Sequence, residues 1–294
     1  MPPSAVPQIP LAGINLNRRT MSIYQPYPEL DELLSDIGKA GRRISEIDAS
    51  EGAAGNISVY IGWSIEPRRN FPKVQVLKMP VAAPGLDGGA FLVSGSGCRL
   101  RDILDDPTAN MGVVVINPDG ETANLYTRHR PAFEHLTSEF NSHIAVHQDQ
   151  INRTGTNFHA IIHAQPQHIT YLSHIPRYQE QDYLNRHLLR WQPELILNLP
   201  RGLGVVPFQV PGSQALMSAT LEKFCEHRVV IWCKHGLMAR SEISTLKASD
   251  RIEYVETAAK YEVLNLANGE MASGLSVEEI GAIARAFNIH QNLF

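Results

Sequence analysis

The sequence predicts one α/β domain with a buried sheet and helices packed against it. Three observations support this fold class: apolar strand-like runs end in polar residues, helical apolar stripes lie between those runs, and no linker separates two cores. A chain of 294 residues can bury a sizeable core without a disulfide or metal staple. We expect a Pro-rich arm over residues 1–27 and a single domain over residues 28–294.

The composition excludes several classes of protein. Hydrophobic residues make up 43% and charged residues 19%, as in ordinary globular proteins. The net charge of −4 offers no electrostatic reason to bind nucleic acid, and no apolar run approaches the roughly 20 residues of a membrane span. Cys98, Cys225 and Cys233 form an odd, widely spaced set without a disulfide framework, and the N-terminus does not resemble a secretory signal. We therefore expect a cytoplasmic protein.

The first half of the chain alternates helical and strand-like patterns. Pro28 can open a helix, and the apolar residues that follow at helical spacing are Leu30, Leu33, Leu34, Ile37, Ile44 and Ile47. Strands are predicted at residues 57–61, 90–93 and 111–116. We expect an irregular surface segment at residues 64–89, which contains four prolines, and a helix at residues 98–104.

The second half contains longer helices. A helix is predicted from an N-cap at Thr137 or Ser138 to about Asn152, and another begins after Ser213. The remaining predicted helices cover residues 181–191 and 243–268, and a last helix opens at the capping box of residues 276–279. The predicted strands and extended runs cover residues 158–162, 194–199, 202–210 and 228–233.

Two loops of small residues are candidates for binding an anion. Residues 51–56 (EGAAGN) lie between a helix and a strand, and residues 94–97 (SGSG) lie between a strand and predicted helical residues. Free backbone N–H groups in such loops can meet a phosphate, although the lysine of a Walker motif is absent. A simple tight turn remains the alternative for the first loop.

Polar residues at two strand ends predict a metal site. His163 and Gln165 are two residues apart at the end of a strand, so their side chains can converge, and His235 ends another buried strand. Two imidazoles and a third polar ligand describe a catalytic divalent site. With Glu139 or Glu194 as a base, such a site suits chemistry next to a carbonyl of a sugar phosphate. Satisfied core histidines are the alternative.

Two further histidines lie on the predicted helix after Glu139. His143 and His147 are four and eight residues beyond Glu139 and lie on its face of the helix. A pair at this spacing can bind metal, but the H-E-x-x-H motif is absent. We assign both histidines a structural role.

A set of motifs in fixed order connects the chain to a known family. The motifs are residues 55–58 (GNIS), 91–97 (FLVSGSG), 106–110 (DPTAN), 137–139 (TSE), 162–163 (IH), 200–207 (PRGLGVVP), 210–213 (VPGS) and 234–236 (KHG). In this order they resemble the class II aldolase/adducin family, and within it the bacterial rhamnulose-1-phosphate aldolases. The resemblance implies a three-layer α/β/α fold, with a central, mostly antiparallel sheet flanked by helices, and a homotetramer.

The resemblance also implies a role for each matching residue. Those facing the substrate phosphate are Asn56, Ser96, Gly97 and Ser138. Glu139 matches the acid/base that moves the proton at C3 of the dihydroxyacetone phosphate part. Glu194 matches a glutamate that reaches the active site of a neighbouring subunit and assists at the aldehyde. His163 and His235 match two of three zinc ligands.

Two positions depart from the family pattern. Gln165 stands where the family has the second histidine of an H-x-H pair, and an amide oxygen is a harder and weaker donor to zinc than imidazole. We expect weaker binding or a changed metal preference, with Glu139 completing the metal's ligands when no substrate is present. His168, three residues beyond Gln165, is expected to face the helix packing. Ala53 stands where close relatives carry an asparagine in the loop at the substrate end.

The sequence thus leads to one function and its alternatives. We expect a zinc-dependent class II aldolase of rhamnose metabolism that cleaves L-rhamnulose 1-phosphate, through a metal-stabilised enediolate, to dihydroxyacetone phosphate and lactaldehyde. One alternative is an aldolase or epimerase acting on another sugar phosphate. A second is a non-catalytic, adducin-like assembly protein whose metal site has been degraded at Gln165.

Overall fold

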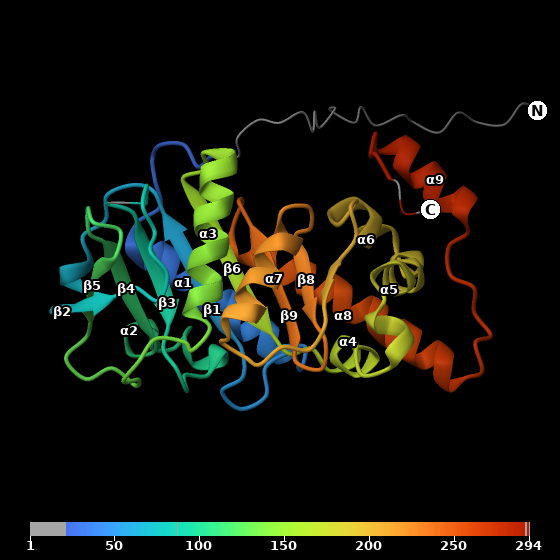
Figure 1. Ribbon diagram of the computed structural model, residues 1–294, viewed down its shortest axis with the longest axis horizontal. Helices are drawn as coiled ribbons and strands as arrows, with labels where there is room; N and C mark the ends of the chain where they lie inside the picture. The colour runs from blue at the N-terminus through green and yellow to red at the C-terminus, as the bar shows by residue number, and fades with distance from the viewer. Residues whose placement is uncertain (1–21, 87, 292, 294) are drawn as a thin grey trace, which may run out of the picture.

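The computed structural model describes residues 22–86, 88–291 and 293. Most of the expected arm, residues 1–21, lies outside the described residues. The described end of the arm, residues 22–27, includes Tyr27, whose ring stacks on Trp63 with 4.8 Å between the ring centroids. The described residues form a central sheet between two layers of helices, which is the α/β architecture that the sequence predicts (Figure 1).

The sheet of the described residues has nine strands. They are β1 (Asn56–Ile61), β2 (Lys73–Lys78), β3 (Ala90–Ser94), β4 (Met111–Ile116), β5 (Thr122–Thr127), β6 (Phe158–Ala164), β7 (Gly204–Val206), β8 (Val229–Trp232) and β9 (Gly236–Ser241). Their order is β2-β5-β4-β3-β1-β6-β9-β8-β7. Neighbouring strands are antiparallel except β7 and β8, so the sheet is mostly antiparallel, as expected.

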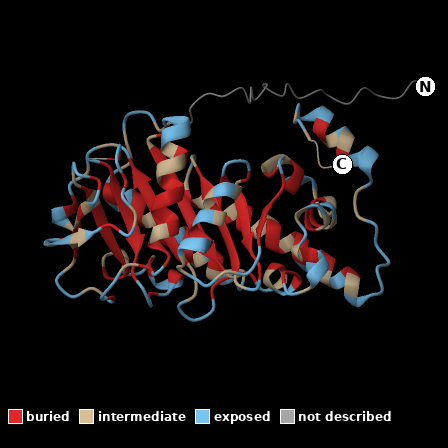
Figure 2. Ribbon diagram, viewed as in Figure 1, coloured by how far each residue is buried: buried red, intermediate tan, exposed pale blue. Residues whose placement is uncertain are grey.

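Helices cover both faces of this sheet (Figure 1). They are α1 (Leu30–Glu46), α2 (Pro107–Asn110), α3 (Phe140–Thr154), α4 (Gln167–Leu172), α5 (Gln181–Leu188), α6 (Pro193–Asn198), α7 (Gln214–Phe224), α8 (Thr245–Ala267) and α9 (Val277–Ala286). The larger apolar core lies between the sheet and α1 and α8, and smaller cores lie under α3 and α7. Buried residues fill the central strands of the sheet and the inner faces of the helices, whereas the edge strand β2 is mostly exposed (Figure 2). No helix within the described ranges is long and apolar enough to cross a membrane.

Helix α1 forms where the apolar stripe predicts it. Glu29 and Glu32 make a capping box at its start, which pairs two backbone N–H groups that the helix itself cannot satisfy. Leu34, Ile37 and Ile44 are at most 2% exposed and join the larger core. The helix therefore closes one face of the sheet and leaves the other face to α3 and α7.

One predicted strand is wrong. Residues 194–199 belong mainly to the helix α6, which begins at Pro193. Proline fits the first turn of a helix, where its missing N–H would have no partner anyway. A short apolar run such as Leu195 and Ile196, both buried, has no periodicity that separates strand from helix.

Other element boundaries also differ from the prediction. Residues 64–89 are not wholly irregular, because they contain the edge strand β2, whose side chains are mostly exposed. The predicted helix at residues 98–104 is only a 3-10 turn, Leu100–Asp102. The N-cap of α3 is Glu139 itself, not Thr137 or Ser138. Strands β5 and β9 follow tight turns and were not predicted.

Candidate active site

One face of the strand pair β1 and β6 is polar near the site. Asn56 lies directly opposite His163 in the ladder, and Tyr60 lies opposite His159. Residues at directly opposed positions project to the same face of a sheet, and every second residue along a strand joins them. Ser58 therefore shares this face, which is covered by α3. The other face of the same two strands is wholly apolar.

Three potential metal ligands meet at the end of this polar face. Glu139 begins α3, His163 is the penultimate residue of β6, and His235 lies in the turn from β8 to β9. His163 Nε2 is 3.6 Å from Glu139 Oε2, and His235 Nε2 is 3.7 Å from Glu139 Oε1. One ligand atom from each residue lies within 4.8 Å of the other two. Segments far apart in the sequence thus supply one cluster.

The two histidines of the cluster are held differently. His163 Nδ1 donates to the carbonyl oxygen of Leu237 at 2.8 Å, which leaves Nε2 with its lone pair toward the cluster. His235 Nδ1 is buried and has no hydrogen-bond partner among the described residues. Trp232 packs against both imidazoles, with ring centroids 4.7 Å from His163 and 5.3 Å from His235. One ring is therefore fixed by a hydrogen bond and the other by packing.

Electrostatics keep Glu139 and His235 in forms that can bind a cation. Burial opposes ionisation of Glu139, but the neighbouring imidazoles of His163 and His235 and the hydrogen bond from Asn56 outweigh it and lower its pKa. Burial, followed by the neighbouring His163, lowers the pKa of His235 to about 4. A carboxylate and a neutral imidazole are forms that ligate metals.

The donor set fits a divalent metal. Two imidazole nitrogens and a carboxylate oxygen are typical ligands of zinc and similar ions. Around a tetrahedral ion at the usual ligand distances, donors lie about 3.4 Å apart. The separations of 3.6 Å and 3.7 Å between the carboxylate of Glu139 and the imidazoles of His163 and His235 are close to this value. The cluster can therefore take such an ion with small side-chain movements.

Gln165 lies beside the cluster, directly after β6. Its backbone N–H donates to the carbonyl oxygen of Ala49 at 2.8 Å. Its side chain runs past Gly236, where a Cβ would lie 3.1 Å from Gln165 Cγ. His168, as expected, faces the helix packing, because its Nδ1 lies 2.6 Å from Glu256 Oε1 on α8.

The residues expected to bind phosphate lie on two adjoining loops. Ser96 and Gly97 follow β3, and Ser138 precedes α3; all three are exposed. The backbone N–H of Ser96 donates to the carbonyl oxygen of His135 at 2.8 Å, which joins the two loops. Both loops therefore adjoin Glu139.

Asn56 and Glu194 lie in contrasting places. Asn56 is buried, and its Nδ2 donates to Glu139 Oε2 at 2.8 Å. Glu194 is exposed on α6 and is not part of the cluster. The structure thus places Asn56, Glu139, His163 and His235 together and Glu194 on the surface.

Sequence reasoning missed part of the polar face. Ser58 and His159 were not singled out, and His143 and His147 were assigned only a structural role. All four are fully buried. Burial lowers the pKa of His143 to about 3 and those of His147 and His159 well below the usual value, so the three rings are neutral. The period-two spacing of Asn56 with Ser58 was the available signal.

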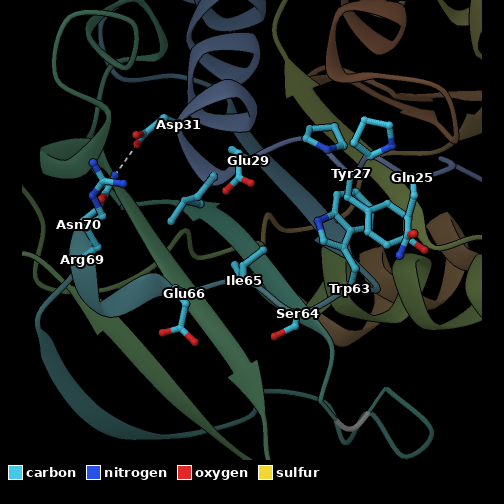
Figure 3. Close-up of a pocket in the computed structure, with 13 residues that line it drawn as sticks. Gln25, Tyr27, Glu29, Asp31, Trp63, Ser64, Ile65, Glu66, Arg69 and Asn70 are labelled. Carbon is cyan, nitrogen blue, oxygen red and sulfur yellow. Dashed lines mark hydrogen bonds between the residues drawn. The ribbon is translucent and has the colours of Figure 1, made fainter.

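A separate cavity lies at the start of α1. It has a volume of about 930 Å³ and is lined by residues that include Tyr27, Glu29, Trp63 and Glu66 (Figure 3). None of the three cluster residues lines it. The cavity is therefore distinct from the candidate active site.

Comparison with known proteins identifies the family. Residues 35–263 match the Class II Aldolase and Adducin N-terminal domain. A rhamnulose-1-phosphate aldolase of Bacteroides thetaiotaomicron is 28% identical over 91% of this chain and 98% of that protein. A rhamnulose-1-phosphate aldolase of Klebsiella pneumoniae is 30% identical over 74% of this chain and 77% of that protein.

A solved structure supports the same assignment. The crystal structure of a sugar-phosphate aldolase from Thermotoga maritima superposes with a TM-score of 0.69 and 26% identity. The superposition covers 83% of this chain and 99% of the other. With the sequence matches, this likeness shows that the chain belongs to the class II aldolase and adducin family and is an aldolase, a lyase.

Proposed function

We propose that this aldolase cleaves L-rhamnulose 1-phosphate reversibly to dihydroxyacetone phosphate and lactaldehyde. The observation that carries the proposal is the meeting of Glu139, His163 and His235. The adjoining loops of Ser96 and Ser138, joined by the hydrogen bond from Ser96 to His135, support it. Relatives that align over up to 91% of the chain are named for this substrate. The names of these relatives also support a role in rhamnose metabolism. The three cysteines of the described residues are free, which suits the reducing cytoplasm, where we place the enzyme.

Membership in the family implies a divalent metal, and we assign it to His163, Gln165 and His235. A bound divalent ion supplies positive charge that stabilises the negative charge developing on the substrate oxygens. His163 presents Nε2 because its Nδ1 is bonded to Leu237. Zinc is our first choice, and the amide of Gln165 makes its binding weaker, or shifts the preference toward a harder ion.

Glu139 is the acid/base in this proposal. It is 4% exposed, and its carboxylate lies beside the imidazoles of His163 and His235 and accepts a hydrogen bond from Asn56. In the cleavage direction the C3–C4 bond breaks with its electron pair left on C3, the C4 hydroxyl loses its proton as it becomes the aldehyde, and protonated Glu139 delivers a proton to C3 of the dihydroxyacetone phosphate part. In the synthetic direction it removes that proton, and the electron pair of the C–H bond stays with the substrate.

The two adjoining loops bind the substrate phosphate in this proposal. Exposed Ser96 and Ser138 offer their hydroxyl groups, and Gly97 and Ser138 offer backbone N–H groups. Asn56 has two amide N–H donors, of which Glu139 takes one, so the other can reach the phosphate. Glu194, exposed on α6, serves the active site of a neighbouring subunit in a homotetramer.

A second candidate substrate is another ketose 1-phosphate. Ala53 is exposed in the loop before β1, where its methyl group cannot donate the hydrogen bonds of an asparagine amide. A substrate with a different arrangement at that end would tolerate this loss. L-fuculose 1-phosphate is the test compound, because it differs from L-rhamnulose 1-phosphate in stereochemistry.

Cleavage by the zinc-reconstituted protein tests the proposal. Glu139→Gln should lower kcat by about 10²- to 10⁴-fold, because a positioned carboxylate contributes this much to proton transfer. Bound zinc, measured by mass spectrometry, should stay in place. Glu134→Gln, at an exposed glutamate of the same segment, is the control and should keep the wild-type rate. Cleavage of fuculose 1-phosphate alone would move the assignment to the second substrate.

A further inference from the structure

Five polar contacts run in series from Glu139 to His159. Glu139 Oε2 is 2.8 Å from Asn56 Nδ2, and Asn56 Oδ1 is 2.6 Å from His143 Nε2. Ser58 Oγ is 2.6 Å from His143 Nδ1 and 2.7 Å from His147 Nε2. The last contact, 2.8 Å long, joins Nδ1 of His147 to Nδ1 of His159. The series lies under α3, on the polar face of β1 and β6.

The carboxylate fixes the direction of the first contacts. An ionised Glu139 only accepts, so the NH₂ group of Asn56 must face it and the amide oxygen must face His143. His143 Nε2 therefore carries a proton and donates to Asn56. Because the ring is neutral, its Nδ1 is bare and accepts from the hydroxyl of Ser58.

The remaining contacts follow from the single proton of a hydroxyl. The hydroxyl of Ser58 donates its one hydrogen bond to Nδ1 of His143. Ser58 Oγ can therefore only accept a hydrogen bond from Nε2 of His147. His147 Nδ1 is then bare and accepts from His159 Nδ1. His159 Nε2 is left without a proton, and it is a buried atom with no partner among the described residues. Every donor in the series thus points toward Glu139.

Charges at the two ends favour the same direction. Arg240 and Arg251 are 8% and 2% exposed, and their charges act on His159. In the deduced direction each hydrogen-bond dipole has its negative end toward these cations and its positive end toward the carboxylate of Glu139. Reversal would bring the amide oxygen of Asn56 against the carboxylate.

We propose that Asn56, His143, Ser58, His147 and His159 form a one-directional hydrogen-bond chain that positions Glu139. The chain holds Oε2 as a hydrogen-bond acceptor and so fixes the orientation of the carboxylate. This inference rests on the proposed role of Glu139. His143, Ser58, His147 and His159 are positioning residues, because they reach the carboxylate only through Asn56, which in the proposed function also binds the phosphate.

The fixed orientation of the carboxylate has a chemical consequence. Because Oε2 accepts from Asn56, the carboxylate cannot turn freely, and Glu139 exchanges its proton with C3 in one geometry. No proton travels along the chain, which keeps its direction throughout.

Histidine tautomers provide a test that does not depend on turnover. We expect long-range ¹H–¹⁵N spectra of ¹⁵N-histidine-labelled, zinc-reconstituted protein to show protons on Nε2 of His143 and His147 and on Nδ1 of His159. Histidine-to-glutamine variants assign the signals. A proton on Nδ1 of His143 would reverse the direction and overturn the proposal.

Breaking the chain at Ser58 tests its role in positioning. Ser58→Ala should lower kcat, and the rate of deuterium exchange at C3 of dihydroxyacetone phosphate, by about 10- to 100-fold with little change in KM. Ser58→Thr, which restores a hydroxyl, should recover part of the rate. Ser142→Ala is the matched control, because Ser142 is also fully buried on this side but its hydroxyl has no partner among the described residues.

The outcomes separate this inference from the proposed function. If Ser58→Ala keeps the wild-type kcat and exchange rate, the chain does not position Glu139. If the wild type itself neither cleaves the substrate nor exchanges the C3 proton, the proposed function fails, and the tautomers still decide the direction. Should Ser58→Ala not fold, His147→Gln and the tautomers of the wild type replace it.

Discussion

The two faces of strands β1 and β6 have opposite characters. One face contributes Ile57, Val59 and Ile61 from β1, and alternate apolar residues from β6, to the larger core. The other face carries Asn56 and Ser58, together with the buried histidines of β6. The same two strands thus join an apolar core to a polar, hydrogen-bonded layer. The period of two in a strand is enough to keep packing and chemistry apart.

The two faces contribute differently to the free energy of unfolding. Burying an apolar side chain stabilises the fold by about 1.5–3 kcal/mol. Burying a polar group is costly unless it is hydrogen-bonded, and a paired group gives only about 1 kcal/mol net. The apolar face therefore contributes most of the free energy of unfolding. The polar face contributes little, because the cost of burying its groups offsets most of the gain from their hydrogen bonds.

Removing a metal ligand from the polar face should have the largest effect. His163→Ala leaves one imidazole and the oxygen donors of Gln165 and Glu139. We therefore expect zinc affinity to fall more than about 100-fold, which exceeds the loss caused by mutating a residue that only supports a ligand. Equilibrium dialysis against zinc measures this change. His174→Ala, at an exposed histidine, should bind zinc like the wild type. Unchanged binding in His163→Ala would place the metal elsewhere.

Shortening a side chain on the apolar face should lower the free energy of unfolding and leave metal binding and catalysis unchanged. Ile61 is fully buried at the end of β1 opposite Phe158, five residues beyond Asn56. We expect Ile61→Ala to lower the free energy of unfolding by about 2–5 kcal/mol, while kcat per folded molecule stays the same. Urea unfolding and active-site titration measure the two quantities. Val76→Ala, 75% exposed on the edge strand, is the control. A large loss of kcat in Ile61→Ala would show that the faces are coupled.

Acid should lower the free energy of unfolding through the buried histidines of the polar face. For each histidine the change per pH unit should be smaller than the effect of Ile61→Ala. Burial, and then neighbouring charges, lower the pKa values of His147 and His159 in the folded state, whereas an unfolded histidine titrates near 6.5. Below this pH only the unfolded chain takes up these protons. The free energy of unfolding should therefore fall by up to about 1.4 kcal/mol per pH unit for each histidine.

Urea unfolding at pH 7.5 and pH 5.5 measures this dependence, and His147→Gln should reduce its slope. The effect of His143 adds to it and continues down to its pKa of about 3. Equal stability at both pH values would mean that the buried histidines are protonated in the folded chain.

The sequence was most informative where a pattern repeats. The stripe of α1 and the apolar strands β1, β4, β6 and β8 were predicted, because their residues follow helical or strand spacing. The helix α6 was missed because its apolar run is short, and β2 because its exposed alternation resembles a surface loop.

The candidate site was predicted only in part for a related reason. His163 and His235 end apolar strands, so each was visible as a polar residue after a buried run. The chain through Ser58 and His159 depends on which residues face each other across β1, β6 and α3. This pairing depends on the register between strands in the assembled sheet, so the spacing of residues along one segment cannot predict it.

The unequal support of the two ligand histidines bears on how firmly the site would hold an ion. His163 is anchored to the backbone of β9, whereas packing alone orients His235 within the described part of the chain. A bound ion would therefore be held by one rigid imidazole and by one that lacks a hydrogen bond behind it. A hydrogen-bond acceptor introduced beside Nδ1 of His235 would make the second ligand as rigid as the first.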